Sequence, residues 1–136
     1  METALRQELE TKIEELKPLA DGTGFIFPTN APEGHTKPYL VYARINTKKI
    51  KTLDGYTGTE HLSYMFSIMA TKYGDMKKLT KKIENLLESL PNSELGSFFI
   101  EDIDINNVDE VYEHELKVNR GIIDFTIYFK EYFKEE

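Results

Sequence analysis

The acidic run that begins at Asp102 is the first stretch of the sequence whose residue types and spacing could do chemistry. Asp102, Asp104 and Asn106 alternate along the chain, and Glu113 stands at the twelfth position counted from Asp102, which partly matches a calcium-binding EF-hand loop. However, the sixth position is Asn107 instead of the glycine that such a loop needs, and no flanking pair of helices is predicted. We therefore interpret the run as the solvated end of a strand and predict no metal site.

The three histidines are the remaining candidates for general-base or metal chemistry. His35, His61 and His114 are scattered, and none belongs to a His-x-x-x-His pair, although His61 is the best placed because it lies on the polar face of a predicted strand. The chain has no cysteine, which excludes disulfides, thiolate metal sites and cysteine nucleophiles. No serine stands in a Gly-x-Ser-x-Gly elbow, and the glycines form neither a P-loop nor a dinucleotide-binding fingerprint. We predict no catalytic residue, no cofactor and no enzymatic activity.

A row of lysines is the strongest basic feature. Lys77, Lys78, Lys81 and Lys82 crowd one side of a predicted helix, where they could contact nucleic acid or an acidic partner, although a solvated helix face is the simpler interpretation. No aromatic residue alternates with these lysines as a base-stacking platform would need, so we favour a protein partner over nucleic acid. The formal net charge of −7 also disfavours nucleic-acid binding, because phosphate contacts need clustered basic residues.

Length and composition predict a single soluble domain covering residues 1–136. A chain of 136 residues leaves little room for a second domain, and 40% hydrophobic with 30% charged residues argues against disorder. Eight tyrosines and eight phenylalanines supply bulk for a core and for subunit contacts. The polar, acidic N-terminus is unlike a secretory signal, and no apolar run approaches the roughly 20 residues that span a bilayer. We expect a product made in the cytoplasm, with no membrane partner.

Two amphipathic helices are predicted to position these groups. In residues 3–17, hydrophobic side chains recur at spacings of four, four and three, and Pro18 marks the end. In residues 75–90, a second hydrophobic stripe follows a predicted N-cap at Asp75, and Pro91 stops the helix. The stripes consist of Leu5, Leu9, Ile13 and Leu16 in the first helix and of Met76, Leu79, Ile83, Leu86, Leu87 and Leu90 in the second.

Four segments have the composition of strands: residues 38–46, 60–71, 97–105 and 118–129. Two of them alternate clearly, with Leu62, Tyr64, Phe66, Ile68 and Ala70 sharing one face and Ile123, Phe125, Ile127 and Phe129 sharing another. The order of elements predicts an α+β fold, in which a largely antiparallel sheet of about four strands carries both amphipathic helices on one face. The Met and Ser face of the second strand is expected to be half-exposed or to lie against a neighbouring subunit.

Two connections are the predicted places of partner contact. Residues 21–37 are rich in glycine and proline and form a long loop, with a short extended piece at residues 25–27. Residues 47–58 form a protruding hairpin tip, because Asp54-Gly55 favours a tight turn. The candidate contact residues are Phe25, Phe27 and His35 in the loop and Lys48, Lys49, Lys51, Asp54 and Tyr56 at the hairpin tip.

Residues 38–87 and the C-terminal third contain a series of motifs that occur together in a known family. The motifs are Tyr39-Leu40-Val41-Tyr42, then Leu53-Asp54-Gly55 followed by Gly58, then Tyr73, Lys77 and Leu79, then Tyr112-Glu113-His114-Glu115-Leu116, and finally the segment from Arg120 to Tyr128. In their order and spacing they resemble the tail-completion family of long-tailed bacteriophages and prophages, over about two thirds of the chain. Residues 21–37 and the acidic run before Val108 depart from the family pattern, so no contact is carried over to them.

The resemblance implies a structural virion protein that caps the tail tube and joins the tail to the head. Such a protein acts as a subunit of a hexameric ring, at the head-proximal end of the tail. One side of the ring meets the major tail tube protein and the other meets the head-completion or stopper protein, while DNA passes through the lumen without specific binding. An acidic lumen, in keeping with the net charge of −7, would repel phosphates.

Two other functions remain open from the sequence. The chain could be a cytoplasmic regulatory or small-ligand-binding α+β domain, with a ligand beside His61, and a ligand-dependent rise in melting temperature would favour that reading. A hydrolase would need a convergent polar pocket, for which the sequence offers no motif.

Overall fold

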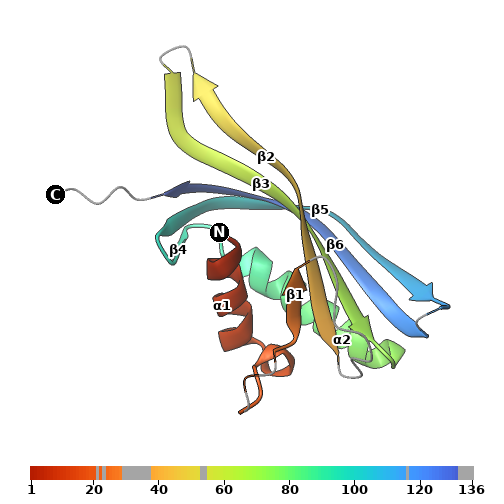
Figure 1. The fold of residues 1–136 in the computed structure, drawn as a ribbon. Helices are drawn as coiled ribbons and strands as arrows, with labels where there is room; N and C mark the ends of the chain where they lie inside the picture. Colours follow the sequence, from red (N-terminus) through yellow and green to blue (C-terminus); the bar gives the residue numbers. More distant parts are fainter. Residues whose placement is uncertain (21, 23, 29–37, 53–54, 116, 132–136) are drawn as a thin grey trace.

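The structure is a computed structural model that describes residues 1–20, 22, 24–28, 38–52, 55–115 and 117–131; at residues 46–52, 55–59 and 131 it describes the backbone alone. Within these described residues, two helices, one short 3-10 turn and six strands follow one another (Figure 1). They are α1 (Glu2–Lys12), η1 (Glu14–Leu16), β1 (Ile26–Pro28), β2 (Tyr39–Thr52), β3 (Gly55–Ala70), α2 (Tyr73–Ser89), β4 (Ser93–Leu95), β5 (Phe98–Glu113) and β6 (Val118–Glu131).

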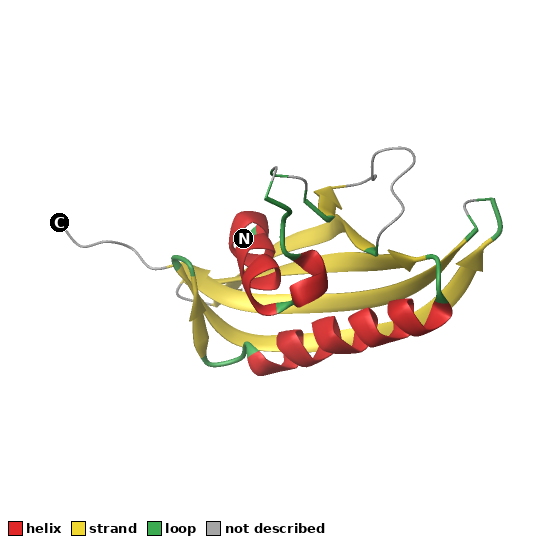
Figure 2. Ribbon diagram, turned by 90° about the horizontal axis from the view of Figure 1, so that it is seen from below, coloured by secondary structure: helices red, strands yellow, loops and turns green. Residues whose placement is uncertain are grey.

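The strands form one sheet in the order β1-β2-β3-β6-β5-β4. β1 runs parallel to β2, and the other neighbouring pairs are antiparallel. Both helices lie over the same face of this sheet, which leaves the other face without a covering layer among the described residues (Figure 2). The predicted α+β class with both helices on one face is confirmed. The sheet is mixed and has six strands, where a largely antiparallel sheet of about four was expected.

The hydrophobic core lies between the helices and the covered face of the sheet. The five alternating residues of β3 from Leu62 to Ala70 are at most 4% exposed, and the four of β6 from Ile123 to Phe129 at most 2%. From the helices, Leu5, Leu9, Leu79, Ile83 and Leu87 are buried against them. The predicted core face of each strand is therefore confirmed, and burial of this apolar area supplies the main driving force for folding.

The helix boundaries differ from the expected ones at two places. α1 ends at Lys12 because Ile13 has an extended backbone (φ −114°, ψ 115°), and the chain then makes the separate turn η1. Ile13 and Leu16 are nevertheless buried. α2 begins at Tyr73 with Lys72 as its N-cap, so Asp75 is not the cap; it lies in the first turn, where its charge complements the helix dipole.

The β2–β3 hairpin extends past the rest of the sheet. β3 pairs with β6 only from Thr59 onward, so residues 50–52 and 55–58 form a two-stranded extension, here called the β2–β3 arm (Figure 1). Thr52 pairs with Gly55, which places Leu53 and Asp54 in the connection; both lie outside the described residues. The predicted antiparallel hairpin is present. Its first strand was expected to end at residue 46 and its second to begin at residue 60, but β2 continues to Thr52 and β3 begins at Gly55.

Candidate interaction surfaces

The uncovered face of the sheet carries a network of polar side chains across β3, β6 and β5. Ser63 Oγ and Thr126 Oγ1 share a hydrogen bond of 2.9 Å, and Asn106 Nδ2 donates to Thr126 Oγ1 at 3.1 Å. Arg120 Nε donates to Ser67 Oγ at 3.0 Å, although Ser67 is only 4% exposed. These bonds satisfy several polar groups that the neighbouring side chains partly bury. Asp124 Oδ1, which lies on the same face of β6, is buried without a hydrogen-bond partner among the described residues.

Three carboxylates give this uncovered face its charge on β5. Asp102, Asp104 and Asp109 stand opposite β6 residues of the uncovered face, and all three are exposed. None of them forms an ion pair with any described residue; the Tyr128 hydroxyl donates to Asp104 Oδ2 at 3.0 Å, which raises the pKa of the Tyr128 hydroxyl. We call these three residues the acidic face. Charge complementarity would direct a basic surface to it.

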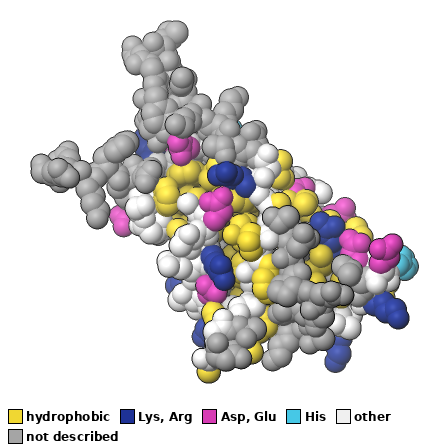
Figure 3. Space-filling model, viewed as in Figure 1, with side chains coloured by type: hydrophobic (Ala, Val, Ile, Leu, Met, Phe, Trp, Pro, Cys, Tyr) yellow, Lys and Arg dark blue, Asp and Glu magenta, His cyan; other side chains and the backbone are white. Residues whose placement is uncertain are grey.

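A groove with the opposite charge lies on the covered side, between α2 and the edge of β5. It has a volume of about 680 Å³ and is lined by Gly74, Lys77, Lys78, Thr80, Lys81, Lys82, Glu84, Asn85, Val108 and Glu110. We call it the lysine groove, because its lysines outnumber its carboxylates. Charged side chains of both signs gather at the end of the molecule where the β5–β6 hairpin lies (Figure 3).

Three of the four groove lysines have local partners. Lys77 Nζ lies 3.6 Å from Glu110 and 3.3 Å from the Tyr73 hydroxyl, and these contacts raise the pKa of Lys77, with the Tyr73 hydrogen bond as the larger cause. Lys82 Nζ donates to the Glu15 carboxylate of η1 at 2.7 Å, and Lys81 lies 3.8 Å from Glu84. Lys78 forms no ion pair with a described residue. The groove therefore presents one unpaired ammonium among lysines that are held in place.

The histidines make ring contacts at the surface. His61 stacks on Tyr128 with 5.1 Å between ring centroids, and His114 meets Tyr112 edge-on at 4.9 Å. His35 lies outside the described residues. Within the described part of the chain, no group of three or more histidine, aspartate or glutamate side chains could hold a metal ion. The EF-hand spacing fails for a structural reason, because β5 runs through it as a continuous strand to Glu113.

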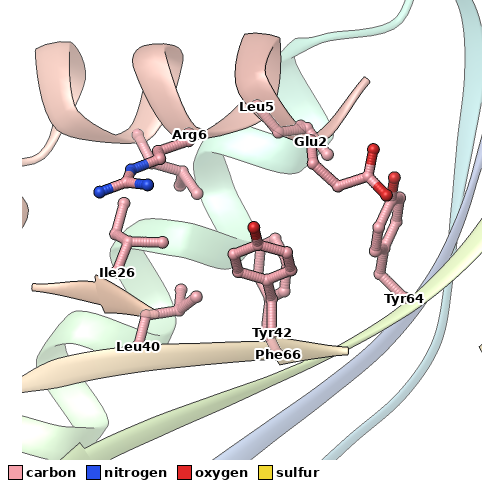
Figure 4. Close-up of a pocket in the computed structure, with 9 residues that line it drawn as sticks. Glu2, Leu5, Arg6, Ile26, Leu40, Tyr42, Tyr64 and Phe66 are labelled. Atoms are coloured by element: carbon pink, nitrogen blue, oxygen red, sulfur yellow. The ribbon is translucent and has the colours of Figure 1, made fainter. Parts of the chain in front are cut away.

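A small pocket lies beneath α1. Its volume of about 10 Å³ is close to that of one water molecule, and its wall consists mainly of apolar side chains from α1, β1, β2 and β3, together with Glu2 and Arg6 (Figure 4). The Tyr64 hydroxyl, on the same side of the sheet, faces the Glu2 carboxylate but makes no hydrogen bond, and burial raises the pKa of this hydroxyl. A space of this size cannot hold a metabolite, for which pockets of several hundred Å³ are usual.

The residues that were predicted to contact partners differ in their burial and in where the fold places them. Phe25 is 5% exposed and packs in the core, so it offers little surface to a partner, while Phe27 is half-buried and meets Tyr39 edge-on at 6.0 Å. Lys48 and Lys49 lie at the base of the β2–β3 arm. Lys51 and Tyr56 pair with each other within the arm through their backbones, and Asp54 lies outside the described residues.

Sequence reasoning did not find the groove, although it found parts of it. The lysine row was recognised, but Val108, Tyr73 and Tyr112, which are 41%, 48% and 46% exposed, were not read as surface residues. The alternation of Asp102 and Asp104 with Ile103 was the available signal that β5 has one acidic face. What the pattern could not give is which helix lies beside which strand edge.

No helix among the described residues is long and apolar enough to cross a membrane.

Comparison with known proteins places the chain in a family. A solved structure titled "Virion of native gene transfer agent (GTA) particle" is similar to the chain with a TM-score of 0.72 and 11% identity, over 96% of this chain and 94% of that one, which shows that the fold is shared. No curated protein sequence matches the chain. Residues 3–130, which include all helix and strand residues described above except Glu2 and Glu131, match the sequence model of the family described as tail completion protein gp17. The chain belongs to this family and is a structural tail-completion protein of the virion.

Proposed function

We propose that the protein caps the tail tube and joins the tail to the head as a subunit of a hexameric ring. The observation that carries this proposal is the family match over residues 3–130, which spans nearly all of the described residues. A ring in this position would contact the major tail tube protein on one side and a head-completion or stopper protein on the other. The similarity to a component of a virion particle supports assembly with other structural proteins.

The protein works in this proposal without catalysis and without a cofactor. Ser63, Ser67, Thr126 and Arg120 of its uncovered face are engaged in hydrogen bonds, and the pocket beneath α1 has room for about one water molecule. DNA would pass through the ring without being held, and exposed carboxylates facing the lumen would repel its phosphates. We also propose that the chain acts as one domain, since its core draws on residues from Leu5 to Phe129.

The contacts to the tube and to the head are proposed to involve the long loop at residues 21–37 and the hairpin tip at residues 47–58. The two-stranded β2–β3 arm supports the second assignment, because its two strands have no further neighbouring strand among the described residues and so expose backbone groups to a partner (Figure 1). Lys48, Lys49 and Lys51 lie on β2 at this end of the hairpin. Acidic residues on the adjoining ring would complement them.

The test is completion of tails made in the absence of this protein. Purified chain is added to such tails and the products are examined by electron microscopy for a capping ring and for head attachment. Addition of the chain is expected to give capped tails that accept heads, whereas tails that stay uncapped and headless would overturn the proposal. Analytical ultracentrifugation measures self-association separately, since a subunit that assembles only on the tube is monomeric in solution. Neighbouring genes for a major tail protein and a head-completion protein would agree with this role.

A further inference from the structure

β5 separates two surfaces of opposite charge. The acidic face (Asp102, Asp104 and Asp109) lies on the uncovered side of the sheet, and the lysine groove lies on the helix side. Val108 and Glu110, which line the groove, flank Asp109 along the strand. The two surfaces therefore point in opposite directions and cannot neutralise each other within one molecule.

Both surfaces are incompletely satisfied within the described part of the chain. Lys78 on one side and the acidic-face carboxylates on the other form no ion pair with a described residue. Solvated charges of this kind are common on single proteins. What distinguishes the groove is its apolar margin, where Val108 of the groove wall exposes 41% of its surface and Tyr73, which donates a hydrogen bond to Glu110, exposes 48%. Exposed aromatic and aliphatic side chains beside an ordered cationic row are typical of a protein-binding surface.

We propose that the lysine groove of one subunit receives the acidic face of β5 from a second copy of this chain. This inference rests on the proposed ring and names the contact that builds it. The two complementary surfaces are different and lie on opposite sides of the molecule, so each subunit that binds one neighbour leaves the other surface free. A contact of this heterologous kind repeats until the ring closes, whereas a self-complementary contact would stop at a dimer.

Charge decides between this occupant and nucleic acid. The whole chain carries a net charge of −7, which repels the phosphates of a nucleic acid. A nucleic acid that extended from the groove past β5 would also come close to the carboxylates of the acidic face. A second copy of the chain would present its acidic face to the groove lysines, while its own lysine groove, on its opposite side, points away from the contact. Tyr73 is also engaged, since its hydroxyl donates to Glu110 at 2.6 Å and Lys77 lies over its ring, and it is therefore not free to stack on a base.

The test is charge reversal with rescue, scored by tail capping. One variant carries Lys78→Glu and Lys81→Glu in the groove, and another carries Asp102→Lys and Asp109→Lys on the acidic face. Each variant alone brings like charges together, and we expect capping to fall by about tenfold or more at equal concentration. A variant with all four substitutions restores complementarity and is expected to regain capping. Mixing the two double variants should also restore it, since alternating subunits then attract at every contact, provided that the ring has an even number of subunits.

The matched control is Lys12→Glu with Lys17→Glu, which makes the same change in net charge on exposed residues outside the groove. It is expected to cap tails as the unmodified chain does, and circular dichroism checks that every variant is folded. Groove variants that cap normally would overturn the inference, as would loss of capping that the fourfold variant does not restore, because the acidic face is then not the occupant. Loss of DNA retention with normal capping would assign the groove to nucleic acid instead. Failure of the unmodified chain to cap tails would count against the proposed function itself.

A crosslink gives a second, independent readout. Because the chain has no cysteine, Lys78→Cys and Asp109→Cys can be combined in one molecule and joined with a short bis-maleimide on completed tails. The contact predicts covalent dimers and higher species up to the ring size. Crosslinked products that remain monomeric on capped tails would contradict it, and a pairing of Lys12→Cys with Asp109→Cys serves as the control.

Discussion

Replacement of Gly121 by alanine tests the packing that fixes α2 beside β5. Gly121 lies in β6 directly under α2, where an added Cβ would overlap Thr80 Oγ1 and lie 2.9 Å from Met76 Sδ. Both neighbours are nearly fully buried, at 6% and 1% exposure. Relief would require α2 to move away from the sheet, and Leu79, which is 0% exposed on the same helix, would then lose its packing.

In Gly121→Ala, the free-energy cost of the steric overlap should exceed the gain from restricting the backbone of the unfolded chain. Overpacking costs about 1–3 kcal/mol, whereas replacing a strand glycine by alanine otherwise gains about 0.5–1 kcal/mol. We therefore expect Gly121→Ala to lower the free energy of unfolding by about 1–2 kcal/mol, or the melting temperature by about 4–8 °C. Urea denaturation measures this as a lower midpoint with an unchanged slope.

Two further variants decide whether the contact is the cause. Thr80→Ala removes the overlapping oxygen, so the double variant with Gly121→Ala should recover most of the loss in a double-mutant cycle. Gly74→Ala is the control, because no atom lies within 4 Å of its added Cβ. In the first turn of α2 it should be neutral or stabilising by up to about 1 kcal/mol. If Gly121→Ala were as stable as the unmodified chain, or if Thr80→Ala gave no recovery, the close approach of α2 to β6 would be wrong.

Three other substitutions test the core and its margins. Phe125→Ala empties a site that is 0% exposed and that packs against two neighbouring rings, and it should cost about 3–5 kcal/mol in urea denaturation. Tyr64→Phe removes a buried hydroxyl that has no hydrogen-bond partner, so the stability should stay within about 0.5 kcal/mol of the original or rise; a larger loss would mean that the hydroxyl is bonded. Glu15→Gln tests pH dependence: burial is the largest single influence and raises the pKa of Glu15, but the hydrogen bond from Lys82, a backbone hydrogen bond and the charges of Lys82 and Lys78 together outweigh it and leave the pKa below its ordinary value. A lowered pKa in the folded state adds stability above the unfolded pKa, and this stability is lost as the pH falls through the folded pKa. The free energies of unfolding of Glu15→Gln and of the unmodified chain should therefore differ by no more than about 1 kcal/mol at pH 7 and converge near pH 3. A difference that persisted at pH 3 would contradict the ion-pair explanation.

The core could be predicted from the sequence because its signal is local. In β3 and β6 every second residue is buried, and the side-chain period of a strand is set by the backbone alone. α2 was likewise placed within two residues of its observed ends, since its stripe and the following Pro91 are both local features. Neither inference needs to know which strand neighbours which.

The sequence prediction ended β2 and β5 too early because bulges in these strands reverse the alternation of hydrophobic and polar residues. The pairing of β5 with β6 shifts register between Ile105 and Asn107, so the side facing α2 changes from odd to even positions and Val108 follows Ile105. A similar shift between Arg44 and Asn46 interrupts β2, at the point where its predicted end was placed. β1 and β4 have three residues each, too few to show any period. The sequence pattern thus broke where the sheet bends, although the strands continue.

The lysine groove and the acidic face depend on how α2 and β5 lie beside each other. The sequence pattern could therefore indicate the lysines and the carboxylates, but not their positions relative to one another. β5 is an edge strand over residues 101–113, because β4 pairs only with residues 98–100. Negative charge along an edge keeps two identical edges apart, since Asp109 would meet like charges in a copy paired edge to edge. The same charge leaves a contact with lysines open. β5 therefore disfavours a symmetric dimer and, under the proposed groove contact, favours a head-to-tail arrangement, the only one of the two that can build a ring.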